Sequence, residues 1–232
     1  RVLFRSVEST LRLCQQIAAA LAAAHHTGVV HRDLKPDNLM LIRDPLVLGG
    51  ERIKVLDFGL AKVAKRTFDD SVSTERGVLM GTPLYMAPEQ CRGAENVGQK
   101  ADVYALGVIL FELLAGRPPF VAREVGEVLA MHQRDEPPRL QTLAPSLPRS
   151  LYTLVGSMLA KDPDARPTMA DVADALQRLE AQHSAEQSAL QVPVGQGSLF
   201  RSGTLWLTLL GILLVALLPL SIQLVRSLLA RK

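Results

Sequence analysis

The sequence predicts a mainly α-helical domain with one small β-hairpin, followed by a polar linker and one transmembrane helix. Three observations lead to this fold class. Most apolar stretches have helical spacing, two short apolar runs flank a segment with proline and glycine, and a 21-residue segment near the C-terminus carries no charge. There is no strand–helix–strand repeat and no internal repeat, so a parallel sheet is not expected.

The first helix is expected at residues 6–27. Leu13, Ile17 and Leu21 recur every four residues, and alanines, which favour helix, fill the gaps between them. The serine at the start suits the N-cap position, and Gly28 is placed to end the helix. This helix therefore has a defined beginning, an apolar face and a defined end.

A β-hairpin is expected next, from apolar runs at residues 39–42 and 53–56. Pro45 and Gly49, which favour turns, lie between the two runs. Residues 57–89 then show little periodicity and predict a long loop. Loops of this length in a compact domain usually carry function.

The remaining helices follow from longer apolar patterns. Residues 101–115 are apolar on nearly every side, which is typical of a helix in the middle of a core. Further helices are expected at 123–134, 147–160 and 169–182. The composition then shifts to glutamine, serine and glycine, which predicts a polar linker at 183–204.

Residues 205–225 carry no charge and predict a transmembrane helix. A helix of that length spans about 30 Å, the thickness of the hydrocarbon core of a bilayer. Trp206 lies near one end, where tryptophan favours the membrane interface, and a short basic tail at 226–232 follows. A buried core helix is the alternative, which the preceding polar linker and the length of the segment disfavour.

Composition excludes several classes of function. The chain has 232 residues, 48% of them hydrophobic, so it can bury a core and is not a disordered chain. The net charge of +3 comes without a run of Lys and Arg, so we expect no nucleic-acid partner. Cys14 and Cys91 are the only cysteines and belong to no CxxC pair, which favours a reduced cytosolic domain and argues against a zinc site.

The stretch HRDLKPDN, residues 31–38, places six charged or polar functional groups between two apolar elements. Asp33 and Asn38 lie in it, and Asp57 follows the predicted hairpin. Because a hairpin brings its two ends together, these oxygen-bearing side chains can meet. Carboxylate and amide oxygens suit Mg²⁺, which leaves other positions for water and phosphate. Lys35 can then neutralise charge on a transferred group, and Asp33 can accept a proton from a hydroxyl.

Three motifs follow one another in the chain: HRDLKPDN at residues 31–38, DFG at 57–59 and APE at 87–89. Together they resemble the C-terminal lobe of eukaryotic-type (Hanks-type) serine/threonine protein kinases, over residues 1–182. The family pattern H-R-D-L-x-x-x-N is followed in order by D-F-G and A-P-E. The matching residues are His31, Arg32, Asp33, Leu34 and Asn38, then Asp57, Phe58 and Gly59, then Ala87, Pro88 and Glu89. All three motifs occur in the family's order, which makes the resemblance specific.

The resemblance implies a role for each site residue. Asp33 would be the catalytic base, Lys35 would contact the γ-phosphate of ATP, and Asn38 and Asp57 would bind Mg²⁺. Lysine in LKP and Thr82 in GTPLYMAPE are similar to serine/threonine kinases rather than tyrosine kinases. The implied cofactors are ATP and Mg²⁺, and the implied partners are proteins with Ser or Thr hydroxyls.

Other residues would support the site. By the resemblance, Glu89 pairs with Arg166, Asp102 holds the backbone of the loop that carries Asp33, and His31 is structural, packing beneath that loop. Arg32 would receive a phosphate from the long loop, with Thr74 as the favoured acceptor over Ser71 and Ser73; solvated hydroxyls are the alternative.

Two histidines at the end of the first helix, His25 and His26, are expected on the surface.

The N-terminal lobe of the family is absent from the sequence. No G-x-G-x-x-G motif and no strand lysine of the V-A-I-K type occurs, and the first residue is arginine, so we expect a fragment that by itself does not turn over ATP. The arrangement of lobe, linker and span is similar to bacterial membrane-anchored kinases, which implies signalling at the membrane. Two readings remain open: a membrane-anchored kinase, and a non-catalytic pseudokinase or scaffold lobe.

Localisation is expected to be single-pass in a membrane, with the lobe in the cytoplasm where ATP is. The charges flanking the predicted span oppose this orientation, since Arg201 precedes it while Arg226, Arg231 and Lys232 follow it. A homodimer is one of the assemblies that the sequence allows.

Overall fold

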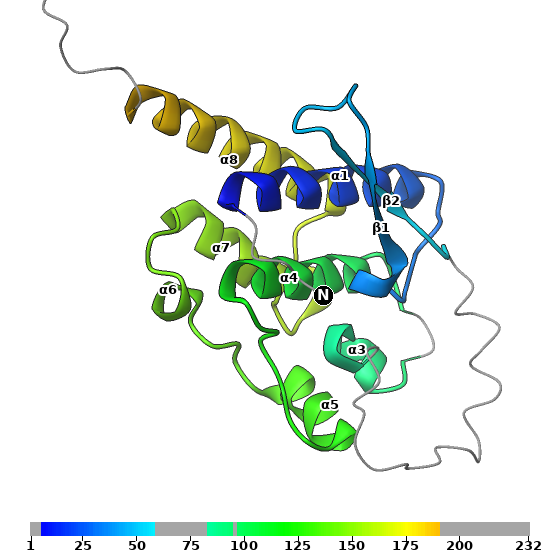
Figure 1. Cartoon of the computed structure of the whole chain (residues 1–232). Coiled ribbons are helices and arrows are strands. Elements are labelled where there is room, and N and C mark those ends of the chain that lie inside the picture. The colour runs from blue at the N-terminus through cyan, green and yellow to red at the C-terminus, as the bar shows by residue number, and fades with distance from the viewer. Residues whose placement is uncertain (1–5, 59–82, 95–96, 191–232) are drawn as a thin grey trace, which may run out of the picture. The chain divides into compact units, whose positions relative to one another are not determined.

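The computed structural model describes residues 6–58, 83–94 and 97–190 (Figure 1). The chain divides into two compact units, Arg1–Gln187 and Ser188–Lys232. Apart from the end of one helix, the second unit lies outside the described residues. The first unit is mainly helical and has one two-stranded antiparallel sheet, which confirms the predicted fold class for this part of the chain.

Helix α1 (Val7–His26) begins and ends where the sequence predicts. The Ser6 hydroxyl accepts a hydrogen bond from the Ser9 amide at 3.2 Å, and Gly28 follows the helix with a φ of 79°. That left-handed conformation favours glycine, which lets the chain turn away from the helix end. The predicted apolar face is buried in the core.

Strands β1 (Leu39–Arg43) and β2 (Glu51–Val55) form the predicted hairpin, with Leu39 opposite Val55. The Gln16 side chain of α1 covers the free edge of β2: its Nε2 donates to the Glu51 carbonyl at 3.1 Å, and its Oε1 accepts from the Ile53 amide at 3.0 Å. An unpaired strand edge is a site for unwanted pairing. Gln16 satisfies this edge and holds the hairpin against α1.

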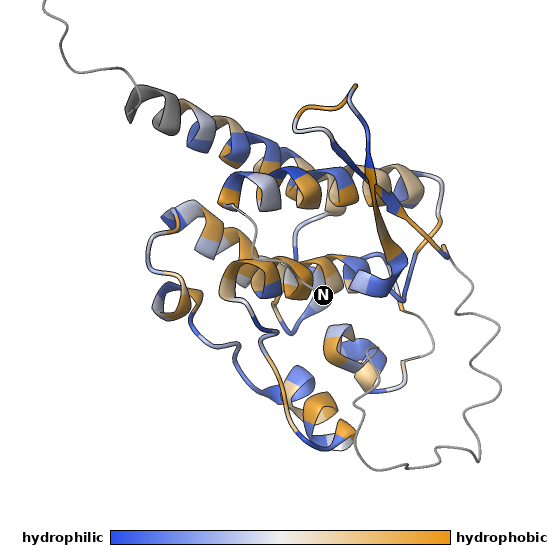
Figure 2. Ribbon diagram, viewed as in Figure 1, coloured by the Kyte–Doolittle hydropathy of each residue, from blue (hydrophilic) through white to orange (hydrophobic). Residues whose placement is uncertain are grey.

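Helix α4 (Lys100–Ala115) is the centre of the core. Figure 2 shows it hydrophobic along most of its length, and its residues 101–111 are all buried. Gly107 allows α7 (Arg149–Met158) to pack closely, because a Cβ at that position would lie 2.9 Å from the Cβ of Met158. The buried position of α4 makes it a fixed platform for the loops that cross it.

The structure has further short and long helices besides these. They are α3 (Pro88–Cys91), α5 (Val125–Arg134), α6 (Leu140–Leu143), α8 (Met169–Leu190) and the 3₁₀ turns η1 (Pro36–Asn38), η2 (Pro83–Tyr85) and η3 (Pro163–Ala165). The short α3 and α6 and the turns carry too little periodicity to be predicted. The prediction that the last helix ends at residue 182 was wrong: α8 continues to Leu190, because residues 183–190 include helix-forming Ala, Gln and Glu and no Gly or Pro.

Three predictions fall partly or wholly outside the described residues. Within the ranges that the structure describes, no helix is long and apolar enough to cross a membrane. The predicted span at 205–225 lies beyond those ranges, as do the polar linker from 191 onward and residues 59–82 of the predicted long loop. The transmembrane helix therefore stays a prediction.

A buried polar cluster joins α4 to α5. His132 has no exposed surface, and its Nδ1 lies 2.9 Å from the Tyr104 hydroxyl. The Lys161 ammonium donates to the His132 carbonyl at 2.8 Å and lies 4.5 Å from the centroid of the Phe120 ring. Burial and this nearby ammonium lower the pKa of His132 to about 4.

This histidine predicts a loss of stability in acid. The pKa of His132 is about 4 in the folded protein and about 6.5 in an unfolded chain. Between these values the unfolded chain binds more protons, so the free energy of unfolding falls as the pH falls through that window, by on the order of 3 kcal/mol. Urea unfolding at pH 7 and pH 4.5 should show a smaller difference in His132→Gln than in wild type. His26→Gln, at an exposed histidine of α1, should leave this difference as it is in wild type. The same difference in unfolding free energy between the two pH values in all three proteins would contradict the prediction.

Candidate functional site

The loop at residues 31–38 is held by a buried carboxylate. Asp102, in the first turn of α4, accepts the His31 amide through Oδ2 at 2.9 Å and the Arg32 amide through Oδ1 at 2.8 Å. Only 1% of Asp102 is exposed, so these bonds offset the cost of burying its charge. The contact between Asp102 and the loop backbone, which the resemblance implies, is present.

His25 also reaches this carboxylate. Its Nε2 lies 2.8 Å from Oδ2 of Asp102, and 8% of the residue is exposed, so the prediction of a surface position was wrong for His25. Its neighbour His26 is exposed. The helix end is near in sequence to the loop but far from Asp102, so the sequence gives no sign of which histidine faces inward.

His31 ties the loop to the end of the hairpin. The ring is fully buried, with Nε2 2.8 Å from the Leu56 carbonyl and an edge contact to Phe58 at 5.1 Å between ring centroids. These contacts lie beneath the loop, where the resemblance puts a structural histidine. They connect the loop to the residues on either side of Asp57.

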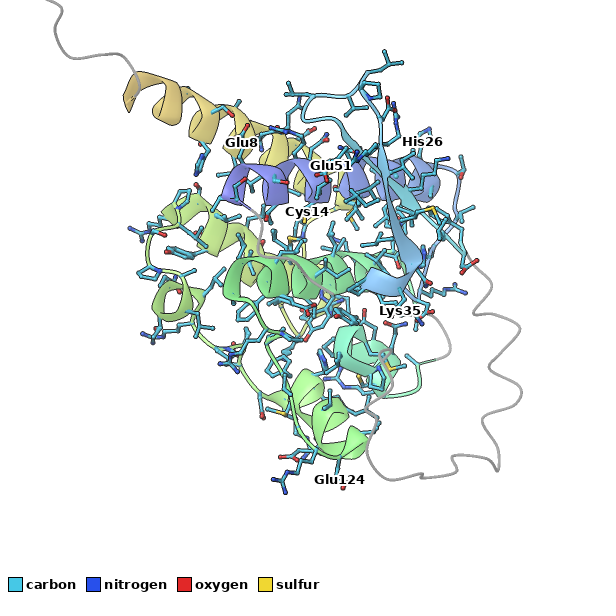
Figure 3. The ribbon with its side chains drawn as sticks, viewed as in Figure 1. Glu8, Cys14, His26, Lys35, Glu51 and Glu124 are labelled. Carbon is cyan, nitrogen blue, oxygen red and sulfur yellow. The ribbon has the colours of Figure 1, made fainter. Side chains whose placement is uncertain are left out.

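Asp33 lies at the centre of a small polar cluster. Its Oδ2 is 2.9 Å from the Lys35 ammonium, and Asn38 Nδ2 donates to the Asp33 carbonyl at 2.7 Å and to Oδ2 at 3.3 Å. Lys35 lies close to the start of β1 (Figure 3). The Asp33 carboxylate is 30% exposed, so a substrate can reach it while its neighbours fix its orientation.

Asn38 and Asp57 provide ligands suited to Mg²⁺. The Asn38 amide nitrogen faces Asp33, which directs the amide oxygen away from that residue. The Leu56 amide donates to the Asn38 carbonyl at 2.9 Å, so the ladder of the hairpin places Asn38 beside the residue that precedes Asp57. Asp57 is exposed. An amide oxygen and a carboxylate are ligands that Mg²⁺ accepts together with water and phosphate oxygens, so the donor set fits the ion.

Two residues of the site have left-handed backbone. Arg32 has a φ of 66° and Asp57 a φ of 57°, and they are the non-glycine residues with positive φ in the described part of the chain. Such conformations cost about 1–3 kcal/mol each and persist where surrounding contacts fix them. Arg32 directly precedes the predicted base Asp33, and Asp57 is itself a predicted Mg²⁺ ligand.

The ion pair between Glu89 and Arg166, which the resemblance implies, is present. It is bidentate, with Nη1 to Oε1 at 2.8 Å and Nη2 to Oε2 at 2.9 Å. Arg166 also donates to the carbonyls of Ala160, Lys100 and Lys161, and its side chain has no exposed surface. Five hydrogen bonds match the five N–H groups of the guanidinium. The pair anchors α3 to the segment before α8.

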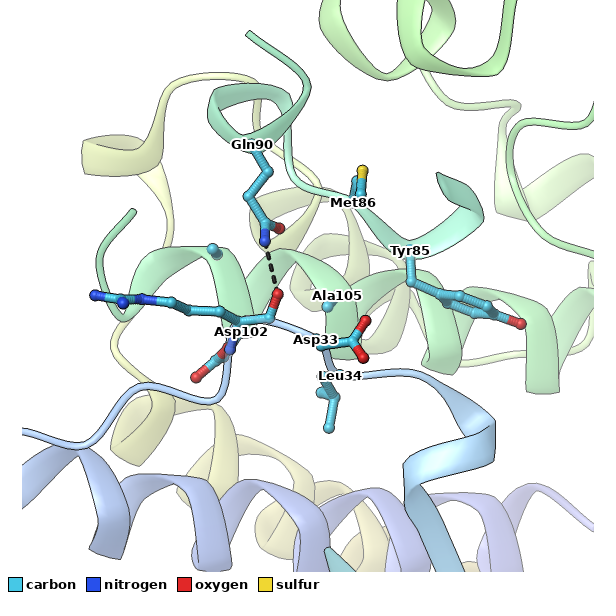
Figure 4. Close-up of a pocket in the computed structure, with 9 residues that line it drawn as sticks. Asp33, Leu34, Tyr85, Met86, Gln90, Asp102 and Ala105 are labelled. Atoms are coloured by element: carbon cyan, nitrogen blue, oxygen red, sulfur yellow. Dashed lines mark hydrogen bonds between the residues drawn. The ribbon is translucent and has the colours of Figure 1, made fainter. Parts of the chain in front are cut away.

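A pocket that opens to solvent lies beside Asp33 (Figure 4). Sequence reasoning missed two residues that line it, Tyr85 and Gln90. The Tyr85 hydroxyl donates to Glu112 at 2.7 Å, and Gln90 Nε2 donates to the Arg32 carbonyl at 2.7 Å. Burial and the Glu112 carboxylate raise the pKa of Tyr85. The only available signal was that both residues lie within two positions of the A-P-E motif.

Gly59, Thr74 and Thr82 lie outside the described residues. Arg32 donates from Nε to the Val97 carbonyl at 3.1 Å. Because Thr74 lies outside the described residues, the role of Arg32 as the receptor for a phosphate stays a prediction.

Known proteins resemble this chain over the same region. The family model for the protein kinase domain matches residues 4–177. Serine/threonine-protein kinase Pkn1 of Myxococcus xanthus is 41% identical over 178 residues, which are 75% of this chain and 24% of that protein. Serine/threonine-protein kinase pkn2 of the same organism is 39% identical over 202 residues, 84% of this chain and 24% of the relative. Serine/threonine-protein kinase PkaA of Streptomyces coelicolor is 42% identical over 165 residues, 71% and 28% respectively. The chain thus spans about a quarter of the length of these relatives.

Proposed function

The chain belongs to the protein kinase domain family, and from that premise we propose that it supplies the substrate-side half of a serine/threonine kinase active site. The reaction is transfer of the γ-phosphoryl group of ATP to a serine or threonine hydroxyl of a protein. The relatives are named as kinases of this specificity, which supports the choice of acceptor. The single observation that carries the proposal is the cluster of Lys35 and Asn38 around Asp33.

Asp33 serves as the base in this proposal. Its carboxylate orients the acceptor hydroxyl and takes its proton as the bond to phosphorus forms. Lys35, 2.9 Å from the same carboxylate, places a positive charge where charge on the transferred group is neutralised. The bonds from Asp102 and Asn38 keep the loop in one geometry, and positioning is the main part of catalysis in phosphoryl transfer.

Asn38 and Asp57 would hold Mg²⁺ in this proposal. The ion would supply positive charge there to offset the charge of the ATP phosphates. The protein's part is to present one amide oxygen and one carboxylate at adjoining ends of the hairpin. The buried His31, bonded to the Leu56 carbonyl, fixes the backbone that leads to Asp57.

The proposal is tested by an assay of the natural full-length protein with radiolabelled ATP. We expect Mg²⁺-dependent transfer to protein substrates or to the protein itself, with label on serine and threonine and none on tyrosine. EDTA should abolish the transfer. Binding of ATP without transfer to any protein would favour the non-catalytic scaffold instead.

We also propose that the protein is anchored in a membrane through residues 205–225, with the kinase domain in the cytoplasm. The support is the uncharged apolar character of the segment in the sequence. Full-length protein should remain in the membrane pellet after carbonate extraction, and deletion of 205–225 should move it to the supernatant. Equal release of both proteins would contradict the anchor.

A further inference from the structure

The peptide bond between Arg32 and Asp33 is held at both of its polar groups. Gln90 Nε2 donates to the Arg32 carbonyl at 2.7 Å, and the Asp33 amide donates to His31 Nδ1 at 3.3 Å. This peptide carries the base of the proposed reaction. It also follows a residue in a left-handed conformation, which needs outside contacts to persist.

Gln90 reaches this peptide from a different part of the chain. It belongs to α3, next to Glu89, and the two adjacent side chains point to different partners. Glu89 pairs with the buried Arg166, while Gln90 extends to the Arg32 carbonyl (Figure 4). Helix α3 therefore connects a fixed anchor in the core to the backbone beside Asp33.

We infer that Gln90 is a positioning residue for Asp33, an inference that rests on the proposed function. Its amide fixes the orientation of the Arg32–Asp33 peptide, and with it the direction in which the Asp33 carboxylate faces a substrate hydroxyl. Asp102 fixes the two amides before this peptide, and Asn38 fixes the carbonyl after it. Without Gln90, the Arg32 carbonyl loses this constraint.

Two variants separate a role of Gln90 in capping α3 from its proposed role in positioning the Arg32–Asp33 peptide. Its Oε1 accepts the Ala87 amide at 3.0 Å, which caps the start of α3. Glutamate keeps that acceptor but cannot donate to the Arg32 carbonyl. Gln90→Glu therefore removes the bond to the loop and preserves the cap, whereas Gln90→Met removes both without adding a charge.

Gln99 offers a matched control. Its Nε2 donates to the His25 carbonyl at 2.8 Å, a bond of the same kind and nearly the same length that does not touch the Arg32–Asp33 peptide. Gln99→Met removes one side-chain amide bond from the same domain. Its cost in stability should be no larger than that of Gln90→Met, since both lose one hydrogen bond to a backbone carbonyl and Gln90→Met also loses the cap of α3.

The test is steady-state kinetics of the full-length protein. In Gln90→Met and Gln90→Glu we expect kcat to fall about 10- to 100-fold, since a small misplacement of a reacting group has effects of that size. The KM for ATP should stay within about twofold of wild type, because the Gln90 side chain bonds to the Arg32 carbonyl and the Ala87 amide and to none of the residues proposed to hold ATP or Mg²⁺. Gln99→Met should keep both constants within about twofold.

Amide hydrogen exchange of residues 31–34 gives a readout that needs no catalysis. It should be faster in both Gln90 variants than in wild type and unchanged in Gln99→Met. Wild-type kcat in the Gln90 variants, or a change confined to the KM for ATP, would overturn the inference. An inactive wild type would instead refute the proposed function, and exchange at residues 31–34 would then decide the inference alone.

Discussion

Replacing Asp33 by asparagine is expected to lower the rate of phosphate transfer at least about 10²–10⁴-fold, the usual contribution of a general base. Asparagine has nearly the same shape, but its amide cannot take the proton of the acceptor hydroxyl. It also cannot form the ion pair with Lys35 that the structure shows at 2.9 Å. The measurement is phosphate transfer by the purified full-length protein under saturating ATP and Mg²⁺.

Asp57→Asn should be at least as damaging, because it removes the carboxylate proposed to hold Mg²⁺. The matched control is Asp37→Asn, which changes an exposed carboxylate four positions beyond Asp33 in the same loop. This variant should transfer phosphate at close to the wild-type rate. If Asp33→Asn or Asp57→Asn kept the wild-type rate, the roles assigned to these two residues would have to be abandoned.

Replacing Arg166 by methionine should lower the free energy of unfolding by roughly 3–5 kcal/mol, the usual cost of breaking a buried ion pair from one side. The Arg166 side chain has no exposed surface, and that of Glu89 is 14% exposed. Methionine fills much of the volume but leaves the Glu89 carboxylate without its two hydrogen bonds. The carbonyls of Ala160, Lys100 and Lys161 also lose their donor. Urea unfolding, monitored by far-UV circular dichroism, measures this loss.

Two further variants sharpen this test. The double variant Glu89→Gln/Arg166→Met should recover part of the stability, since no unpaired charge stays buried. Arg52→Met removes an ion pair with Asp44 in which the arginine is 47% exposed, and it should cost no more than about 1 kcal/mol. Equal losses in Arg52→Met and Arg166→Met would show that the buried pair contributes little.

The sequence predicts the elements whose evidence lies within one stretch. Helix α1 has its apolar repeat, a capping serine and a terminating glycine, and α4 is apolar on nearly every side, so both were predicted to within one or two residues. The hairpin follows from two apolar runs and a turn. The end of α8 was missed because a polar sequence of good helix formers reads as linker when only composition is considered.

The site divides in the same way. The position of Asn38 beside the end of β2 follows from the hairpin, which the sequence alone indicates. The contacts of Asp102 and Arg166 were available only through the resemblance to a family, because each joins residues more than 60 positions apart. His25 and Gln90 carry no such signal. One had been placed on the surface and the other had no predicted role, because only the folded arrangement shows what each side chain faces.

The long sequence separation of these contacts has a consequence for the order in which the protein is made. The His31 amide is held by Asp102, which is synthesised 71 residues after His31. Glu89 is held by Arg166, which is synthesised 77 residues after Glu89. Arg12 of α1 pairs with Glu180 of α8 at 2.9 Å, across 168 residues. Contacts between residues far apart in sequence form late, because the whole segment between them must be synthesised and the loop that it forms must be closed at a cost in entropy. A nascent chain that has emerged only as far as β2 therefore has Asp33, Lys35 and Asn38 but lacks Gln90 and Asp102, which hold the loop backbone. Protection of the 31–38 loop from protease should appear only after α4 has been synthesised.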